Sequence, residues 1–463
     1  MPLETFTLYP TQKHNRPPAP SKISLHGLDL LSAPIQIHNH RFYHCPKDNS
    51  IAEVIDKLKA SLAEALELYP TVAGLVTVDD KGDAYIATTD VPGTPFLIEK
   101  RDTPFDGKDS EDLSPRTEQI LAPGSSSFAV KITEFSCGTI VVASSLHHQV
   151  ADLRGFLDFL EVWAMIARDE DINESRLPDD WTRTPGRFFQ GLNDDDDDDD
   201  HSSPPPPPPF GLLDTPATGP PAYLLVPSKV TRWELTRESM AQMKKDLSPP
   251  PQSDSWISTG DALSALLSGA VARAREQAKV PRLEGRSSEA SGVEKIAMAA
   301  DGRDRCPDRT MAGGKYFGNF NNLWSVSIPR TDLLTPTSEA SGRVALAVRQ
   351  GLQAALAPKA VADRIAFFEN PTNTHPAGRI VWSADIILTN WCRFDLKGPE
   401  FDLGWGKPFM TTDGSGSVFP PGYSLMTQDY DSGNVVILLT VEHDAVEALK
   451  SDPLLTRYAT PLV

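Results

Sequence analysis

The sequence has few cysteines and no segment that could cross a membrane. Its four cysteines, Cys45, Cys137, Cys306 and Cys392, lie far apart and show no paired spacing. This pattern argues against a disulfide framework or a cysteine-type zinc site and favours reduced thiols in a reducing compartment. No apolar run approaches the roughly 18 residues that a membrane-spanning helix needs. Residues 1–20 lack the apolar core of a secretory signal, so we expect a cytoplasmic protein without a membrane partner.

Basic residues are in deficit. The chain has 44 Lys and Arg against 63 Asp and Glu, a formal net charge of −19. This balance argues against nucleic acid or an anionic membrane as the main partner. One run of aspartates supplies part of the excess, which leaves room for a local basic patch that binds an anionic cofactor. With 463 residues and 40% hydrophobic content, the chain can bury a large core and is long enough for two domains.

The first half of the chain predicts helices beside hairpins. Apolar residues recur at helical spacing over 51–67, and a second helix is expected over 153–168. Two hairpins are expected between them, one from strands 72–78 and 84–89 and one from strands 128–135 and 139–146. The strand 139–146 is apolar on both faces, so we expect it to lie inside its sheet.

A low-complexity tract divides the chain. Residues 193–209 read NDDDDDDDHSSPPPPPP, in which the aspartates repel one another and the prolines favour an extended chain, so the tract is unsuited to a packed core. Composition favours a solvated crossover loop, and an acidic docking tract is the alternative. We therefore expect an N-terminal lobe at 1–180, a linker at 181–225 and a C-terminal lobe at 226–463.

The second half repeats this mixture of elements. Ser258 and Thr259 offer a cap for a helix over 261–278. Further strands are expected over 294–300, 323–328, 379–388 and 434–442, and further helices over 338–356 and 443–450. Helix-and-hairpin material in both halves predicts a mixed α/β protein with two comparable lobes.

The residues 147–152, HHQVAD, follow the apolar strand 139–146. Polar residues between a buried strand and a helix often form the active site of an α/β protein. A histidine has an ordinary pKa of about 6.5, so His148 could accept a proton as a general base. His148 could equally be a hydrogen-bonded buried histidine, and Asp152 could be the N-cap of the following helix. The HxxxD spacing alone does not choose between these interpretations.

A second motif lies near the C-terminus. Residues 402–408 read DLGWGKP and follow TNWCRFDLKGPEF at 389–401. Taken alone, DLGWGKP could be a glycine-rich turn around a packed tryptophan. Together with HHQVAD, it closely resembles the BAHD family of acyl-CoA-dependent acyltransferases, which carry HxxxD near the middle and DFGWG near the C-terminus. Two positions depart from the pattern: Leu403 replaces the usual phenylalanine, and Leu153 replaces the glycine common after the aspartate.

Three ordered blocks extend the resemblance over nearly the whole chain outside 193–209 and the tract around 281–292. They read LKASLAEALELYPTVAGLV, STGDALSALLSGAVARARE and DGRDRCPDRTMAGGKYFGNF. The low-complexity tract and the residues of these blocks resemble those of fungal family members that act in secondary metabolism. The resemblance implies two chloramphenicol-acetyltransferase-like α/β lobes, each a mixed sheet with flanking helices, and an active-site channel between them.

The resemblance also assigns roles to individual residues. His148 matches the general base. Asp152 matches an aspartate that pairs with an arginine, which by position is Arg303. This pair holds the histidine loop, residues 147–152. Thr389 and Trp391 match positions that face the tetrahedral intermediate, and Ser258 and Thr259 match a region along the coenzyme A pantetheine. A structural motif away from the reacting atoms is formed by Asp402, Gly404, Trp405 and Gly406.

The expected reaction is acyl transfer from coenzyme A, as co-substrate, to a hydroxyl or amine of a small molecule. A thioester is already activated, so the acceptor can attack directly without an acyl-enzyme, and the chain has no G-x-S-x-G elbow. Two alternatives remain: a condensation-type enzyme that takes its acyl group from a carrier protein, and a non-catalytic binding module. We expect a monomer with no permanently bound cofactor and no metal, although His38, His40 and His44 lie close in sequence. We expect His147 either to pack in the interior or to support the base from behind, rather than to act as the base.

Overall fold

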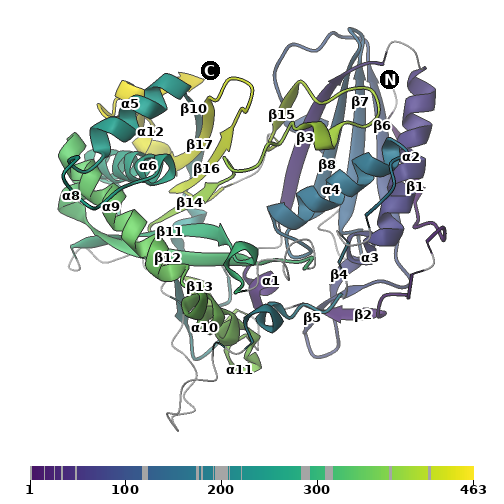
Figure 1. Cartoon of the computed structure of the whole chain (residues 1–463), viewed down its shortest axis with the longest axis horizontal. Helices are drawn as coiled ribbons and strands as arrows, with labels where there is room; N and C mark the ends of the chain where they lie inside the picture. The colour runs from purple at the N-terminus through teal and green to yellow at the C-terminus, as the bar shows by residue number, and fades with distance from the viewer. Residues whose placement is uncertain are drawn as a thin grey trace.

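The computed structural model shows two sheet-rich lobes side by side (Figure 1). It describes residues 3–14, 16–25, 27–32, 35–46, 50–116, 124–173, 177–178, 181–190, 192, 207, 209–219, 222–282, 292–307, 316–374, 378–414 and 419–462. The Asp/Pro tract at 193–209 lies outside these residues except for 207 and 209, so its two interpretations stay open.

The N-terminal lobe is built on a six-stranded mixed sheet. Its order is β1 (Glu4–Leu8), β6 (Thr94–Arg101), β7 (Phe128–Phe135), β8 (Thr139–His147), β3 (Gln36–His44) and β15 (Met410–Thr412). Strands β6 and β7 pair in parallel and the other neighbours pair antiparallel. The β7–β8 hairpin is as predicted, and β8 lies inside the sheet with every residue buried.

Two helices cover one face of this sheet, α2 (Ile51–Leu68) and α4 (Leu153–Ala167) (Figure 1). Both helices were predicted. Ser50 caps α2 in a capping box with Glu53, which explains the start of the helix. The smaller elements of this lobe are β2 (Lys22–Ser24), α1 (Gly27–Leu31), α3 (Pro70–Ala73), β4 (Leu75–Val78) and β5 (Ala84–Ala87), and the β4–β5 hairpin confirms the first predicted hairpin.

The C-terminal lobe has a seven-stranded mixed sheet. Its order is β12 (Asn321–Pro329), β11 (Val293–Asp301), β14 (Ile386–Asn390), β16 (Tyr423–Gln428), β17 (Val435–Glu442), β10 (Ser228–Leu235) and β18 (Thr460–Leu462). The helices are α5 (Arg237–Leu247), α6 (Thr259–Gln277), α8 (Arg330–Leu334), α9 (Ser338–Ala355), α10 (Pro358–Glu369), α11 (Pro371–Thr374), α12 (Val446–Lys450) and α13 (Leu455–Tyr458). The buried side of α6 packs in the core of this lobe.

One predicted strand was wrong. The run 379–388 forms two strands, β13 (Ile380–Trp382), which pairs with β9 (Phe210–Leu212), and β14, which lies in the large sheet. The break spans residues 383–385, and the carboxylate of Asp385 accepts a hydrogen bond from the backbone N–H of Lys295 at 2.7 Å. This side-chain contact brings the chain into the large sheet only from Ile386 onward.

The C-terminal half of the chain also completes the N-terminal lobe. Strand β15 pairs with β3, and Figure 1 shows it beside the N-terminal strands. Leu396, Phe401 and Leu403, which precede β15, lie in the core between the N-terminal sheet and its helices. The segment 391–412, called the exchanged segment below, therefore belongs to the N-terminal lobe although it follows strands of the C-terminal lobe.

Candidate active site

His148 follows the buried strand β8. Its backbone N–H donates to the carbonyl of Ile35 at 2.8 Å. Its Nδ1 atom is buried and has no hydrogen-bond partner among the described residues. Burial lowers the pKa of His148, and its own backbone, Asp152, Asn319 and Asp29 oppose that shift. The imidazole is therefore uncharged near neutral pH and able to accept a proton.

Asp152 combines the two roles that the sequence left open. As N-cap of α4, its Oδ1 accepts a hydrogen bond from the Gly155 N–H at 3.0 Å. Arg303 donates from Nη1 to Oδ2 at 2.9 Å and from Nη2 to Oδ1 at 3.2 Å. Burial opposes ionisation, yet this ion pair holds the pKa of Asp152 below its ordinary value.

Arg303 lies just after β11, in the C-terminal lobe, and is only 4% exposed. Its guanidinium also donates to the Gly318 carbonyl at 2.9 Å and to the Tyr316 carbonyl at 3.3 Å. The Phe320 N–H in turn donates to Asp152 Oδ2 at 2.8 Å. The histidine loop is thus attached to the C-terminal lobe through a buried and extensively hydrogen-bonded ion pair.

His147 makes an internal contact. Its Nδ1 accepts a hydrogen bond from the Gln149 N–H at 3.2 Å, and its residue is 6% exposed. Burial, followed by the neighbouring His148, lowers the pKa of His147 to about 4. These contacts support the expected packing role.

The DLGWG residues form a rigid turn against the N-terminal lobe. Oδ1 of Asp402 accepts hydrogen bonds from the N–H groups of Gly404, Trp405 and Gly406 at 2.7, 3.1 and 2.9 Å. Gly404 and Gly406 have φ angles of +103° and +119°, a region that favours glycine. Arg168, at the end of α4, donates to the Asp402 carbonyl. The motif therefore fastens the exchanged segment to α4.

Thr389 and Trp391 lie where the chain leaves the C-terminal sheet. Thr389 is half-buried on β14 and contacts Tyr423, whose pKa burial raises to about 12. Trp391 donates from its backbone N–H to the Met426 carbonyl at 2.8 Å, and its side chain packs against the N-terminal core. No hydrogen bond among the described residues joins either of them to His148.

Ser258 and Thr259 begin α6 as expected. Ser258 is the N-cap and forms a capping box with Asp261. Thr259 lines a pocket of about 500 Å³ between α5, α6 and the end of β14. Arg237 and Lys244 on α5 line the same pocket, which thus presents two cations beside a helix N-terminus.

The three histidines of β3 are engaged by other side chains. His38 Nδ1 lies 2.6 Å from Ser145 Oγ, and His40 Nδ1 lies 2.7 Å from Asp109 Oδ1. His44 stacks on Phe409 with ring centroids 4.5 Å apart. Within the described ranges, no group of three or more His, Cys, Asp or Glu side chains could hold a metal ion.

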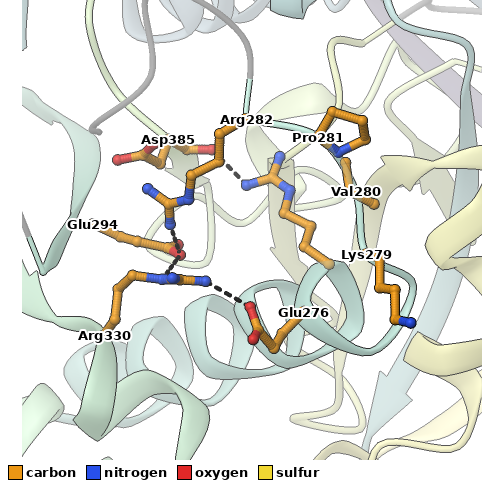
Figure 2. A pocket seen from close by; sticks show the side chains of 9 residues that line it. Glu276, Lys279, Val280, Pro281, Arg282, Glu294, Arg330 and Asp385 are labelled. Carbon is orange, nitrogen blue, oxygen red and sulfur yellow. Dashed lines mark hydrogen bonds and ion pairs between the residues drawn. The ribbon is translucent and has the colours of Figure 1, made fainter. Parts of the chain in front are cut away.

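A second pocket, of about 280 Å³, lies at the end of α6 (Figure 2). Figure 2 shows Arg282 and Arg330 pointing toward Glu294. The nitrogen-to-oxygen distances are 2.5 Å from Arg282 Nη2 and 3.3 Å from Arg330 Nε. Arg330 also contacts Glu276 at 2.7 Å. Because these charges pair with one another, we interpret the pocket as an ion-pair network that joins α6, β11 and α8.

The family model described as the Transferase family matches residues 8–456. The chain belongs to this BAHD acyltransferase family. The match spans both lobes, so the family assignment confirms the resemblance stated from the two motifs.

Curated relatives agree with the family. The chain is 25% identical over 446 residues to "Acyltransferase uat1" of Mycosarcoma maydis, a match that covers 85% of this chain and 81% of that protein. It is 32% identical over 158 residues to "Putrescine hydroxycinnamoyltransferase 1" of Oryza sativa subsp. japonica, covering 32% of this chain and 35% of the relative.

Solved structures show the same fold. TRI101 of F. sporotrichioides, complexed with coenzyme A and T-2, superposes with a TM-score of 0.70 at 17% identity, covering 95% of this chain and 99% of that one. Vinorine synthase superposes with a TM-score of 0.65 at 18% identity, covering 96% of each chain. These BAHD structures confirm the expected two-lobed α/β architecture. In the part of the chain described, every helix is too short or too polar to span a bilayer.

Sequence reasoning missed several residues at this site. Arg237 and Lys244 lie in a helix that was not predicted. Asn319 belongs to the quoted block ending in YFGNF, and that block could have drawn attention to it. Asp29 and Arg183 carried no recognisable motif, although both contact the surroundings of the histidine loop.

Proposed function

We propose that this BAHD protein transfers an acyl group from an acyl-CoA to a hydroxyl or amine of a small molecule, with His148 as general base. The observation that carries this proposal is the buried Nδ1 of His148 on a loop that hydrogen bonds hold to Ile35 on one side and to Asn319 and Arg303 on the other. Burial lowers the pKa of this imidazole. A base must be deprotonated at the working pH and held near its target, and both conditions suit this geometry.

In the proposed reaction, His148 takes the proton of the acceptor hydroxyl or amine as the acceptor attacks the thioester carbonyl. The carbon–sulfur bond then breaks, and the proton passes to the departing thiolate, which gives free CoA and the ester or amide. We assign Thr389 and Trp391 to the side of the tetrahedral intermediate, where a hydroxyl or N–H donor would stabilise the oxyanion. The half-buried Thr389 side chain supports this assignment.

We propose that the acyl-CoA enters along the N-terminus of α6. Thr259 lines the 500 Å³ pocket together with Arg237 and Lys244, and these two cations suit the phosphates of coenzyme A. The pantetheine arm would then pass Ser258 and Thr259 toward the end of β14, where Asn390 lines the same pocket. Asp152 and Arg303 would hold the loop without touching substrate.

A screen of CoA release tests this function. The purified full chain would be given acetyl-, malonyl-, benzoyl- or coumaroyl-CoA with benzyl alcohol or putrescine as acceptor, and free thiol would be followed against the His148→Ala variant. Release that needs both the acceptor and His148 supports the proposal. Turnover only with acyl groups loaded on a carrier protein would favour the condensation-type alternative, and acyl-CoA binding without turnover would favour a binding module.

A further inference from the structure

The backbone carbonyls of the histidine loop are held by a second set of buried residues. Asn319 Nδ2 donates to the His148 carbonyl at 2.8 Å. Arg183 Nη2 donates to the Val150 carbonyl and, at 3.4 Å, to the Gln149 carbonyl. Asp152 and Arg303 fasten only the end of the loop, so these contacts fix its beginning and middle.

Asn319 is itself tightly oriented. Its backbone N–H and its Nδ2 each donate to Asp29 Oδ1 at 3.0 Å. Its Oδ1 accepts a hydrogen bond from Ser32 Oγ at 3.1 Å. Asn319 is fully buried, and its amide group has partners on both the oxygen and the nitrogen. Only one orientation of the amide satisfies these contacts.

A buried ion pair supports this asparagine. Arg183 Nε lies 3.3 Å from Asp29 Oδ2, with the two side chains 1% and 0% exposed. Arg183 Nη1 also donates to the Phe317 carbonyl at 3.2 Å. A Cβ on Gly318 would lie 2.4 Å from Arg183 Nη1, so glycine is needed for this close approach.

Three distant parts of the chain thus meet at the loop. Asp29 comes from α1, Arg183 from the segment after α4, and Asn319 from the loop before β12. We propose that Asn319, oriented by the Asp29–Arg183 ion pair, is the positioning residue that sets the place of the His148 imidazole through the His148 carbonyl. This inference rests on the proposed function of His148 as base.

The charged groups around His148 agree with this role. Burial lowers the pKa of His148, and Asp152, the Asn319 side chain and Asp29 each raise it. His147 is a neighbouring titratable group, and burial, followed by His148, lowers its pKa to about 4. Arg303 and Arg183 each face one of the two aspartates. Loss of Asn319 should therefore lower the pKa of His148 as well as misplace its ring.

The test compares Asn319→Ala with Asn322→Ala in the full chain. Asn322 is a matched control, because it is 3% exposed and lies three residues along the chain but contacts Arg364. The pKa of His148 would be followed by NMR of ¹³C-labelled histidine rings, with its signal assigned by its loss in His148→Gln. Kinetics would use acetyl-CoA and benzyl alcohol, or the acceptor found in the screen.

We expect Asn319→Ala to lower the His148 pKa and to reduce kcat at least about tenfold with KM for acetyl-CoA nearly unchanged, since a misplaced base slows the chemical step. Asn322→Ala should keep the wild-type pKa and kcat. A wild-type pKa and kcat in Asn319→Ala overturn the inference. If Asn319→Ala does not fold, Ser32→Ala takes its place, because it removes one contact to the Asn319 amide. Ser32→Ala should also lower the His148 pKa and kcat. Wild-type values of both in Ser32→Ala would overturn the inference equally.

The same experiment separates this inference from the proposed function. Wild-type CoA release by His148→Ala would refute His148 as base, whatever the NMR titration shows. An inactive His148→Ala together with an unshifted Asn319→Ala would refute only the positioning role.

Discussion

Arg303 of the C-terminal lobe and Asp152 of the N-terminal lobe form a buried ion pair with two hydrogen bonds, at 2.9 and 3.2 Å. The same carboxylate caps α4 and accepts the Phe320 N–H. One side chain therefore starts a helix, ends the histidine loop and joins the lobes, so a change at Asp152 should affect stability and activity together.

The ion pair predicts non-additive mutations. Arg303→Met should cost about 3–5 kcal/mol of unfolding free energy, because it leaves the buried Asp152 carboxylate without its cation. Asp152→Ala should cost less, because Arg303 Nη1 keeps its ion pair with Asp301 Oδ1 at 3.2 Å. The double variant should lose less than the sum of the two. Asp152→Asn retains a capping oxygen but should still be destabilised, unlike a residue that is only an N-cap. Urea midpoints and initial rates measure these effects, and additive penalties would contradict the coupling.

The two adjacent histidines should behave very differently. His148→Ala should leave the protein folded and reduce turnover at least about 100-fold, the lower end for loss of a general base. His147→Ala should cost far less, because its ring makes an internal contact. Circular dichroism and initial rates check both variants. The opposite order of penalties would show that the HxxxD register is displaced by one residue.

Buried neutral histidines predict a loss of stability in mild acid. Burial, with His40 as the next cause, lowers the pKa of His38 from 6.5 to about 3, and burial lowers the pKa of His147 from 6.5 to about 4. Between these values and 6.5 the unfolded chain binds more protons than the folded chain, so unfolding free energy falls as pH falls. In the double variant His38→Gln/His147→Gln, the urea midpoint should fall less than in the wild type between about pH 7 and pH 5. Equal slopes would contradict the shifts.

The pocket beside α6 predicts a binding defect. Arg237→Ala/Lys244→Ala should raise KM for acetyl-CoA by roughly three- to fivefold at low salt, with kcat unchanged, because exposed ion pairs contribute up to about 1 kcal/mol. Lys245→Ala is the control, since Lys245 is exposed on the same helix but does not line the pocket. Steady-state kinetics at two salt concentrations decide the matter. An unchanged KM for acetyl-CoA in the double variant would show that the CoA phosphates do not bind in this pocket.

The DLGWG motif should act on stability alone. Asp402→Ala removes the acceptor of three backbone N–H groups and should cost about 1–3 kcal/mol in unfolding free energy. The folded fraction should keep its turnover, because the motif packs on α4 rather than on the histidine loop. Thermal melting and rates normalised to folded protein test this. A large fall in normalised kcat would place the motif at the reacting atoms.

Local patterns were sufficient for much of the fold. Apolar spacing predicted α2 and α6, and short strands separated by turns predicted the β4–β5 and β7–β8 hairpins. The formation of these elements depends on residues that are close in sequence, so the spacing of apolar and turn residues predicts them. The run 379–388 was predicted wrongly, because a side-chain contact from Asp385 to Lys295 breaks it into two strands.

The sequence by itself determined the two motifs, the family resemblance they support and the residues expected to carry the chemistry. The tertiary structure alone decided how the loop is held: Asp29 and Asn319 meet across 290 positions, and β15 joins the sheet of the opposite lobe. Contacts between distant segments depend on the packing of whole elements, which leaves no periodic trace in one sequence. For this reason the proposed base could be named from its motif, whereas the asparagine that we propose to position it could be found only from the contacts between the two lobes.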